Sequence, residues 1–306
     1  MNGWSTHTKG LALALLTAGI SGVAVYVNGL GVSRFDDATV YTTAKNLVAA
    51  LILLAVLAPG RAGGGAWRRP RSGRDRRMLA AIAVIGGSVP FVLFFEGLSR
   101  AASADAAFIH KTLIVWVALL AVPLLGERLN LWHVGAIGLL IAGQAVLTED
   151  LTAFSLGSGE WMILGATLLW ALEFVVAKRV LADAGSLTVG AARMAGGVVL
   201  LLGYLAATGR LGALTGLSAG AWAWAALVGA ILAGFVASWY AALARIQAVD
   251  AAAVLVFAAV ITAGLSGLLD GASLAPAALG LVLVTAGTAA AAVAVLRRRE
   301  REAVPT

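Results

Sequence analysis

Ten apolar stretches, each about as long as a membrane-spanning helix, fill most of this chain and restrict the folds it can adopt. A helix that crosses about 30 Å of hydrocarbon needs about 20 predominantly apolar residues. Stretches of this kind occupy residues 10–31, 38–58, 77–98, 103–123, 131–148, 160–182, 186–208, 219–243, 250–269 and 276–296. The pattern predicts an all-α integral membrane protein with ten transmembrane helices.

The composition agrees with a lipid solvent and argues against an enzyme. Apolar residues make up 61% of the 306 residues and charged residues only 12%, too few to cover a soluble surface. The chain has no cysteine, and its three histidines are scattered along the sequence. HExxH and phosphate-loop motifs are missing from it. We therefore expect no catalytic residues, no metal site and no cofactor, and neither a nucleic acid nor an ATPase as partner.

The basic residues between the spans indicate how the chain is oriented. Lys and Arg are enriched in cytoplasmic loops of membrane proteins. With the N-terminus on the cytoplasmic side, sixteen of them lie inside and only three outside, namely Arg34, Arg100 and Arg210. The first apolar run lacks a convincing cleavage site, so we expect it to be retained as a span. The sequence thus predicts a multi-pass protein of the bacterial inner (plasma) membrane with both termini in the cytoplasm.

One charged corner occurs twice in the chain. The stretch LSRAASADAA at 98–107 returns 145 residues later as LARIQAVDAA at 243–252. Gly126 and Gly271 recur at the same offset. Five spans separate the two corners, an odd number, so we expect them on opposite faces of the membrane. The chain is therefore predicted to consist of two inverted five-helix repeats, residues 1–150 and 151–306.

The charged side chains of these corners also suit a structural role. Arg100 and Arg245 lie near a helix C-terminus, where positive charge is favourable. Asp105 and Asp250 come early in the next helix, where a carboxylate can accept the free backbone N–H groups. We expect both aspartates to act as helix caps, with a role in gating as the alternative.

Ionisable and aromatic side chains inside the spans mark a candidate substrate site. A charge in the hydrocarbon region costs at least about 2.5–3.5 kcal/mol, so it normally faces a polar cavity or a partner. Such charges would suit a zwitterion, while a ring would contact its side chain. The predicted substrate-binding residues are Tyr26, Glu96, His110, Lys111, Trp170, Glu173, Trp239 and Tyr240. Lys45 and Arg193 are predicted to be structural partners, and internal ion pairing is an open alternative for all the charged groups.

Two stretches resemble a known transporter family. LLGERLNLWHVGAIGLLIAGQAVL at 124–147 and GATLLWALEFVVAKRVL at 165–181 are similar to parts of the EamA-type repeat of the drug/metabolite transporter superfamily. The resemblance implies ten helices in two inverted halves. FFEGLSRAAS at 94–103 looks most like the YddG-type aromatic amino acid exporters. LLDGASL at 268–274 departs from the Leu-Gly-Glu that the family would have there.

These observations together predict a secondary transporter. We expect it to export aromatic and neutral amino acids and related small metabolites by alternating access, with the substrate and the lipid bilayer as its partners. An exporter of cationic drugs or quaternary amines is an alternative that would use the buried glutamates. A scramblase-like protein that handles lipids is another.

Overall fold

The computed structural model describes residues 5–32, 34–58, 68, 70, 72–101, 103–148 and 156–303, and its regular elements there are all α-helices. The expected boundary between the halves at 150/151 and part of the arginine-rich loop lie outside the described residues. The helices are α1 (Thr6–Val32), α2 (Ala38–Leu57), α3 (Gly73–Ile85), α4 (Val89–Leu98), α5 (Ser103–Lys111), α6 (Leu113–Leu125), α7 (Leu131–Leu147), α8 (Ser158–Val180), α9 (Ser186–Ala207), α10 (Leu211–Thr215), α11 (Ala219–Leu243), α12 (Ala248–Leu255), α13 (Ala258–Leu269) and α14 (Ala278–Ala303).

The predicted all-α membrane fold is confirmed. In the described part of the chain, nine helical stretches are long and apolar enough to cross a membrane, and the shorter apolar helix α7 has 17 residues. Three of the spans are each built from two consecutive helices, α3 with α4, α5 with α6, and α12 with α13. The sequence pattern did not predict these interruptions, because hydrophobicity continues across them.

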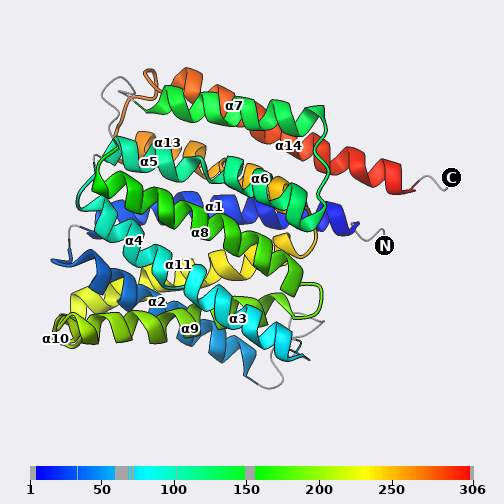
Figure 1. Cartoon of the computed structure of the whole chain (residues 1–306). Coiled ribbons are helices and arrows are strands. Elements are labelled where there is room, and N and C mark those ends of the chain that lie inside the picture. The colour runs from blue at the N-terminus through cyan, green and yellow to red at the C-terminus, as the bar shows by residue number, and fades with distance from the viewer. Residues whose placement is uncertain are drawn as a thin grey trace.

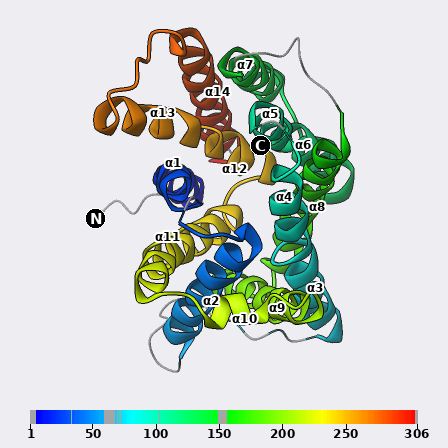
Figure 2. The same ribbon diagram turned by 90° about the vertical axis from the view of Figure 1, so that its left-hand side faces the viewer.

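Figure 1 shows the helices side by side, with both chain termini at one end of the bundle. We call this end the termini end and the opposite one the far end. Helix α7 packs along α14, and α1 lies against α11 and α13, as Figure 2 also shows. Helix α2 contacts α9 and α11, and α4 runs along α8. Segments from both halves of the chain are therefore interleaved throughout the bundle.

The interruption between α3 and α4 has a local cause. Two glycines and Ser88 follow α3, and Pro90 lies in the first turn of α4. Proline has no backbone N–H to donate and suits a first turn. The Ser88 hydroxyl donates to the carbonyls of Ala83 and Val84 at 3.1 and 3.2 Å, so the side chain satisfies acceptors near the break. A Cβ on Gly87 would collide with the Arg193 carbonyl, which shows how closely α9 approaches this point.

Two further glycines end spans at opposite ends of the bundle. Gly126 follows α6 with φ of 68°, and Gly271 follows the C-cap of α13 with φ of 69°. Glycine adopts this left-handed conformation without the steric strain that a side chain would introduce. In Figure 1 the connection after α6 lies at the termini end, and the connection after α13 lies at the far end.

Candidate functional site

Four ring-bearing side chains form a cluster between α4, α5 and α8, which we call the aromatic cluster. Trp170 of α8 lies 5.1 Å from His110 of α5 and 5.6 Å from Phe94 of α4, measured between ring centroids. Phe94 is 5.1 Å from His110, and Phe91 meets Trp170 edge-on at 5.4 Å. Such distances are typical of favourable aromatic pairs. The structure therefore brings together two of the predicted site residues, His110 and Trp170.

The interrupted span positions Trp170. Its indole N–H donates to the carbonyl of Gly86 at 3.2 Å, at the end of α3. Gly86 also contacts the Glu173 side chain so closely that a Cβ there would collide with it. The Nδ1 atom of His110 is buried and has no hydrogen-bond partner among the described residues. The cluster thus combines fixed apolar faces with one unsatisfied polar atom.

Glu173, Tyr240 and Arg193 form a second group, the Glu173 group. The Tyr240 hydroxyl donates to the Glu173 carboxylate at 2.5 Å, and both side chains are fully buried. The Arg193 guanidinium lies close enough to both for electrostatic interaction, and it also lies over the Phe91 ring at 5.9 Å. The second carboxylate oxygen of Glu173 has no hydrogen-bond partner in the described part of the chain. Here a buried carboxyl group is accompanied by a buried guanidinium.

A third group, the Lys45 group, consists of Lys45, Asn28, Tyr41 and Phe95. The Lys45 ammonium lies 2.9 Å from the Asn28 amide oxygen, which also accepts the Tyr41 hydroxyl at 2.7 Å. The same ammonium lies over the rings of Tyr41 at 4.7 Å and Phe95 at 5.2 Å. Lys45 is only 7% exposed. Within the described residues no carboxylate pairs with it, so the expected internal ion pair is not found.

Three other predicted site residues, Tyr26, Trp239 and Lys111, do not add a side-chain ring contact or hydrogen bond to the aromatic cluster in the described part of the chain. Tyr26 donates to Asp270 at 2.7 Å on an exposed surface. Trp239 is fully buried and packs on Phe174 at 4.4 Å in the hydrophobic core. Lys111 follows His110, and its half-buried side chain has no hydrogen bond or ion pair to a described residue. These positions follow from the packing of α1, α5 and α11, which a single sequence does not define.

Glu96 takes part in an ion network at the far end. Arg210 contacts Asp37 at 3.1 Å and Glu96 at 3.0 Å, and Arg100 approaches Glu96 at 3.8 Å. Partial burial lowers the pKa of Arg210, but hydrogen bonds to Glu96 and Asp37 outweigh it and raise the pKa above its usual value. Asp37 also caps α2 through the N–H groups of the next turn. The network joins the start of α2 to the ends of α4 and α9.

At the termini end, the side chain of Glu127, which lies between α6 and α7, reaches the start of α12. Its carboxylate accepts the backbone N–H groups of Ala248 at 2.6 Å and Val249 at 3.1 Å, the first two residues of α12. We call this arrangement the Glu127 cap. Burial raises the pKa of Glu127, while the two amides and the nearby Lys178 charge oppose that shift without cancelling it. Glu127 thus caps a helix about 120 residues further along the chain.

The expected capping role of Asp250 is wrong. Asp250 does lie in the first turn of α12, but its carboxylate contacts the His133 ring at 3.0 Å, because Glu127 already accepts the free N–H groups. Arg245 does meet expectation, since it donates back to the Ala241 carbonyl near the end of α11. Lys178 adds bonds of 2.6 and 2.5 Å to the carbonyls of Leu243 and Ile246. Sequence reasoning gave no role to Glu127 or His133, although both are polar residues beside a span end in a strongly apolar chain.

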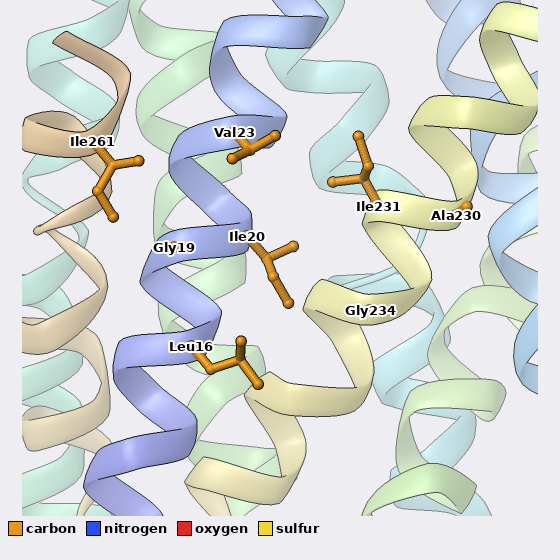
Figure 3. Close-up of a pocket in the computed structure, with 8 residues that line it drawn as sticks. All are labelled: Leu16, Gly19, Ile20, Val23, Ala230, Ile231, Gly234 and Ile261. Atoms are coloured by element: carbon orange, nitrogen blue, oxygen red, sulfur yellow. The ribbon is translucent and has the colours of Figure 1, made fainter. Parts of the chain in front are cut away.

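A separate groove of about 650 Å³ lies between α1, α11 and α13 and contains none of the predicted site residues. Figure 3 shows its apolar lining, Leu16, Gly19, Ile20, Val23, Ala230, Ile231, Gly234 and Ile261. Leu16 is 53% exposed, so the groove is open to the surroundings of the bundle. In a membrane these surroundings are lipid, and the groove offers no polar group to orient a solute.

These features define the class of protein. Spans that carry ionisable side chains in their interior and contain interrupted helices are typical of secondary transporters. A family model described as the EamA-like transporter family matches residues 8–148 and again residues 157–293. Since these matches cover most of the sequence, the chain belongs to the EamA-like transporter family, as its sequence motifs predicted. It is a membrane transporter of small molecules.

Individual proteins similar to this chain include a sequence relative and a solved structure. One is an "Uncharacterized transporter in cobO 3'region" of Sinorhizobium sp., 27% identical over 135 residues, which are 44% of this chain and 92% of that protein. The other is a solved structure described as "Crystal structure of protein", with a TM-score of 0.74 and 18% sequence identity. It covers 93% of this chain, and 98% of its own length is matched. At this identity the likeness supports the fold alone.

Proposed function

We propose that the protein is a secondary transporter that exports aromatic and neutral amino acids and related small metabolites by alternating access. The observation that carries the proposal is the aromatic cluster of Phe91, Phe94, His110 and Trp170, with the Lys45 and Glu173 groups beside it. Rings suit an aromatic side chain, while a cation and a carboxylate suit the two charges of a zwitterion. The orientation proposed is the bacterial inner membrane with both termini in the cytoplasm.

Three observations support two inverted repeats as the basis of alternating access. The family model matches the chain twice, once in each half. The left-handed glycines Gly126 and Gly271 are 145 residues apart, and so are Thr112 and Phe257, which interrupt corresponding spans. In Figure 1 the corner between α4 and α5 lies at the far end and that between α11 and α12 at the termini end. Inverted halves can expose one central site to either side in turn.

The orientation is testable because the chain has no cysteine of its own. Single-cysteine variants Arg100→Cys and Arg245→Cys, labelled in intact cells with a membrane-impermeant maleimide, should react on opposite sides of the membrane. Only Arg100→Cys is expected to react from outside. Reaction of both variants from the same side would contradict the inverted arrangement and the transport mechanism that depends on it.

Transport by purified protein in proteoliposomes tests the substrate class. Radiolabelled tryptophan and phenylalanine should exchange faster than across protein-free vesicles, and Trp170→Ala should weaken their transport more than that of alanine. Trp161→Ala is a matched control, because Trp161 lies on the same helix but is 57% exposed. Equal losses for aromatic and small substrates would remove Trp170 from the site.

The Glu173 group supports a second candidate, an exporter of cationic drugs or quaternary amines. Its fully buried carboxylate has one oxygen without a partner among the described residues, and a cation could approach it. Competition experiments separate the candidates, since tetraphenylphosphonium should inhibit tryptophan transport only if it uses the same site. The same vesicles, given an imposed pH gradient, test proton coupling, and a flat response favours facilitated diffusion.

A further inference from the structure

The Lys45 and Glu173 groups are built from corresponding positions of the two halves. Asn28 and Glu173 are 145 residues apart, and so are Phe95 and Tyr240. The two cations, Lys45 and Arg193, are 148 residues apart on the second span of each half. In each group a cation from α2 or α9 lies near a polar side chain from α1 or α8 and a ring from α4 or α11.

The two groups differ in charge. Glu173 supplies a carboxylate near Arg193, so the Glu173 group can be neutral within itself. At the corresponding place beside Lys45 stands Asn28, whose amide has nearly the shape of an aspartate but no charge. A buried charge without an opposite charge is strongly unfavourable. The Lys45 group is therefore short of one negative charge relative to its counterpart.

The Lys45 ammonium also has spare hydrogen-bonding capacity. An ammonium has three N–H donors, and in the described part of the chain a single acceptor, the Asn28 oxygen at 2.9 Å, is bonded to it. Its other neighbours are the faces of Tyr41 and Phe95, which attract a cation but do not neutralise it. Carboxylates form strong, charge-assisted hydrogen bonds with such an ammonium.

A continuous row of rings leads from Lys45 to the aromatic cluster. Phe95 lies under the Lys45 ammonium, its ring is 5.5 Å from that of Phe94, and Phe94 is 5.6 Å from Trp170. A molecule with a carboxylate at Lys45 would therefore extend its apolar part along aromatic faces. The His110 ring lies 5.1 Å from that of Phe94, and its buried Nδ1 has no hydrogen-bond partner among the described residues.

We propose that Lys45 is the carboxylate-binding residue of the substrate site, and that the missing charge at Asn28 is supplied by the carboxylate of an aromatic substrate. This inference rests on the proposed transport function and narrows its substrate class to aromatic carboxylates, with or without an amino group. It also changes the role of Lys45 from the structural one predicted from sequence to substrate recognition.

The test places a carboxylate of the protein itself beside Lys45, by the substitution Asn28→Asp. Binding of indole-3-propionate and of its uncharged amide to purified protein is measured by isothermal titration calorimetry. The wild-type protein should favour the carboxylate about tenfold to hundredfold, the range of one charge-assisted hydrogen bond. Asn28→Asp should reduce this preference to near unity, because the introduced carboxylate would pair with Lys45 in place of the ligand. Lys45→Gln should have the same effect, and Lys45→Arg should keep a preference for the carboxylate.

Asn130→Asp is the matched control, since it makes the same substitution at the N-cap of α7, where a carboxylate is also favourable. It should leave the preference unchanged. Equal binding of acid and amide by wild type, no binding of either, or an unchanged preference in Asn28→Asp would each overturn the inference. If amino acid transport persists in that case, the proposed function stands without it. If the preference depends on Lys45 but no amino acid is transported, the binding inference stands and the proposed function fails.

Discussion

Removing the Glu127 carboxylate should destabilise the packing of α12 at the termini end. Glu127→Ala leaves the N–H groups of Ala248 and Val249 without their acceptor at the buried start of α12. Loss of a helix cap costs about 0.5–2 kcal/mol, and an unsatisfied buried donor about 1–3 kcal/mol. We therefore expect a loss of about 2 kcal/mol, which is about a 30-fold shift in the equilibrium between the packed and the locally unfolded start of α12.

Glu127→Gln separates the hydrogen bonds from the charge. The amide oxygen of glutamine has two lone pairs and can accept from the same backbone groups. Because burial raises the pKa of Glu127, the charged form is the disfavoured one in the folded protein. The glutamine variant should therefore stay close to wild type, while the alanine variant should not.

The measurement is the rate at which a buried cysteine reacts with a maleimide. Ala252 of α12 is 4% exposed, and Ala252→Cys would be the single cysteine of the chain. Adding Glu127→Ala should raise its labelling rate about 30-fold if opening precedes reaction. Glu160→Ala is the control, because that buried carboxylate accepts the N–H of Gly157 at the start of its own helix, α8. Equal labelling rates for wild type and Glu127→Ala would refute the reasoning.

Three further predictions concern the packing, the ion network and the pH response. Gly87→Ala should lower stability by about 1–3 kcal/mol because its Cβ would collide with the Arg193 carbonyl. Gly138→Ala has open space around it and should instead stabilise α7. Equal thermal midpoints for the two variants would contradict this prediction. Arg210→Gln should lower the unfolding free energy by about 1 kcal/mol or less, since its partners are partly exposed, and a larger loss would show a stronger network. Burial raises the pKa of Glu127 above its ordinary value of 4.5, so protonation of this carboxylate stabilises the folded protein. The stabilisation is complete below the ordinary pKa and is lost as the pH rises through the raised pKa. Midpoints of Glu127→Gln should lack that pH-dependent step, and identical profiles would contradict the assignment.

Much of the architecture could be predicted from the sequence because lipid imposes a simple rule on length and hydrophobicity. The spans, the family and the positions of the chain-reversing glycines Gly126 and Gly271 follow from local patterns. Of the candidate site residues, His110 and Trp170 do meet, and Glu173 does meet Tyr240. Ionisable side chains stand out in an apolar helix, so their presence is visible even when their partners are not.

The partners themselves depend on how the helices pack. A period of 3.6 residues specifies which face of a helix is apolar, but in a nearly uniform apolar chain that signal is weak. The placement of Tyr26 at Asp270, of Glu96 in an ion network and of Trp239 in the core was therefore not available from sequence. The interruptions near Gly87, Thr112 and Phe257 were hidden for the same reason, since hydrophobicity does not change where a backbone bends.

By itself, the sequence determined that this chain crosses a membrane many times and carries charges within its spans, because length and polarity are local properties. Only the tertiary structure decided that Glu127 caps α12 and that Lys45 meets an amide instead of a carboxylate. Contacts of this kind join side chains from helices distant in sequence. They depend on the rotation and depth of each helix relative to its neighbours, which are set by the packing of the whole bundle.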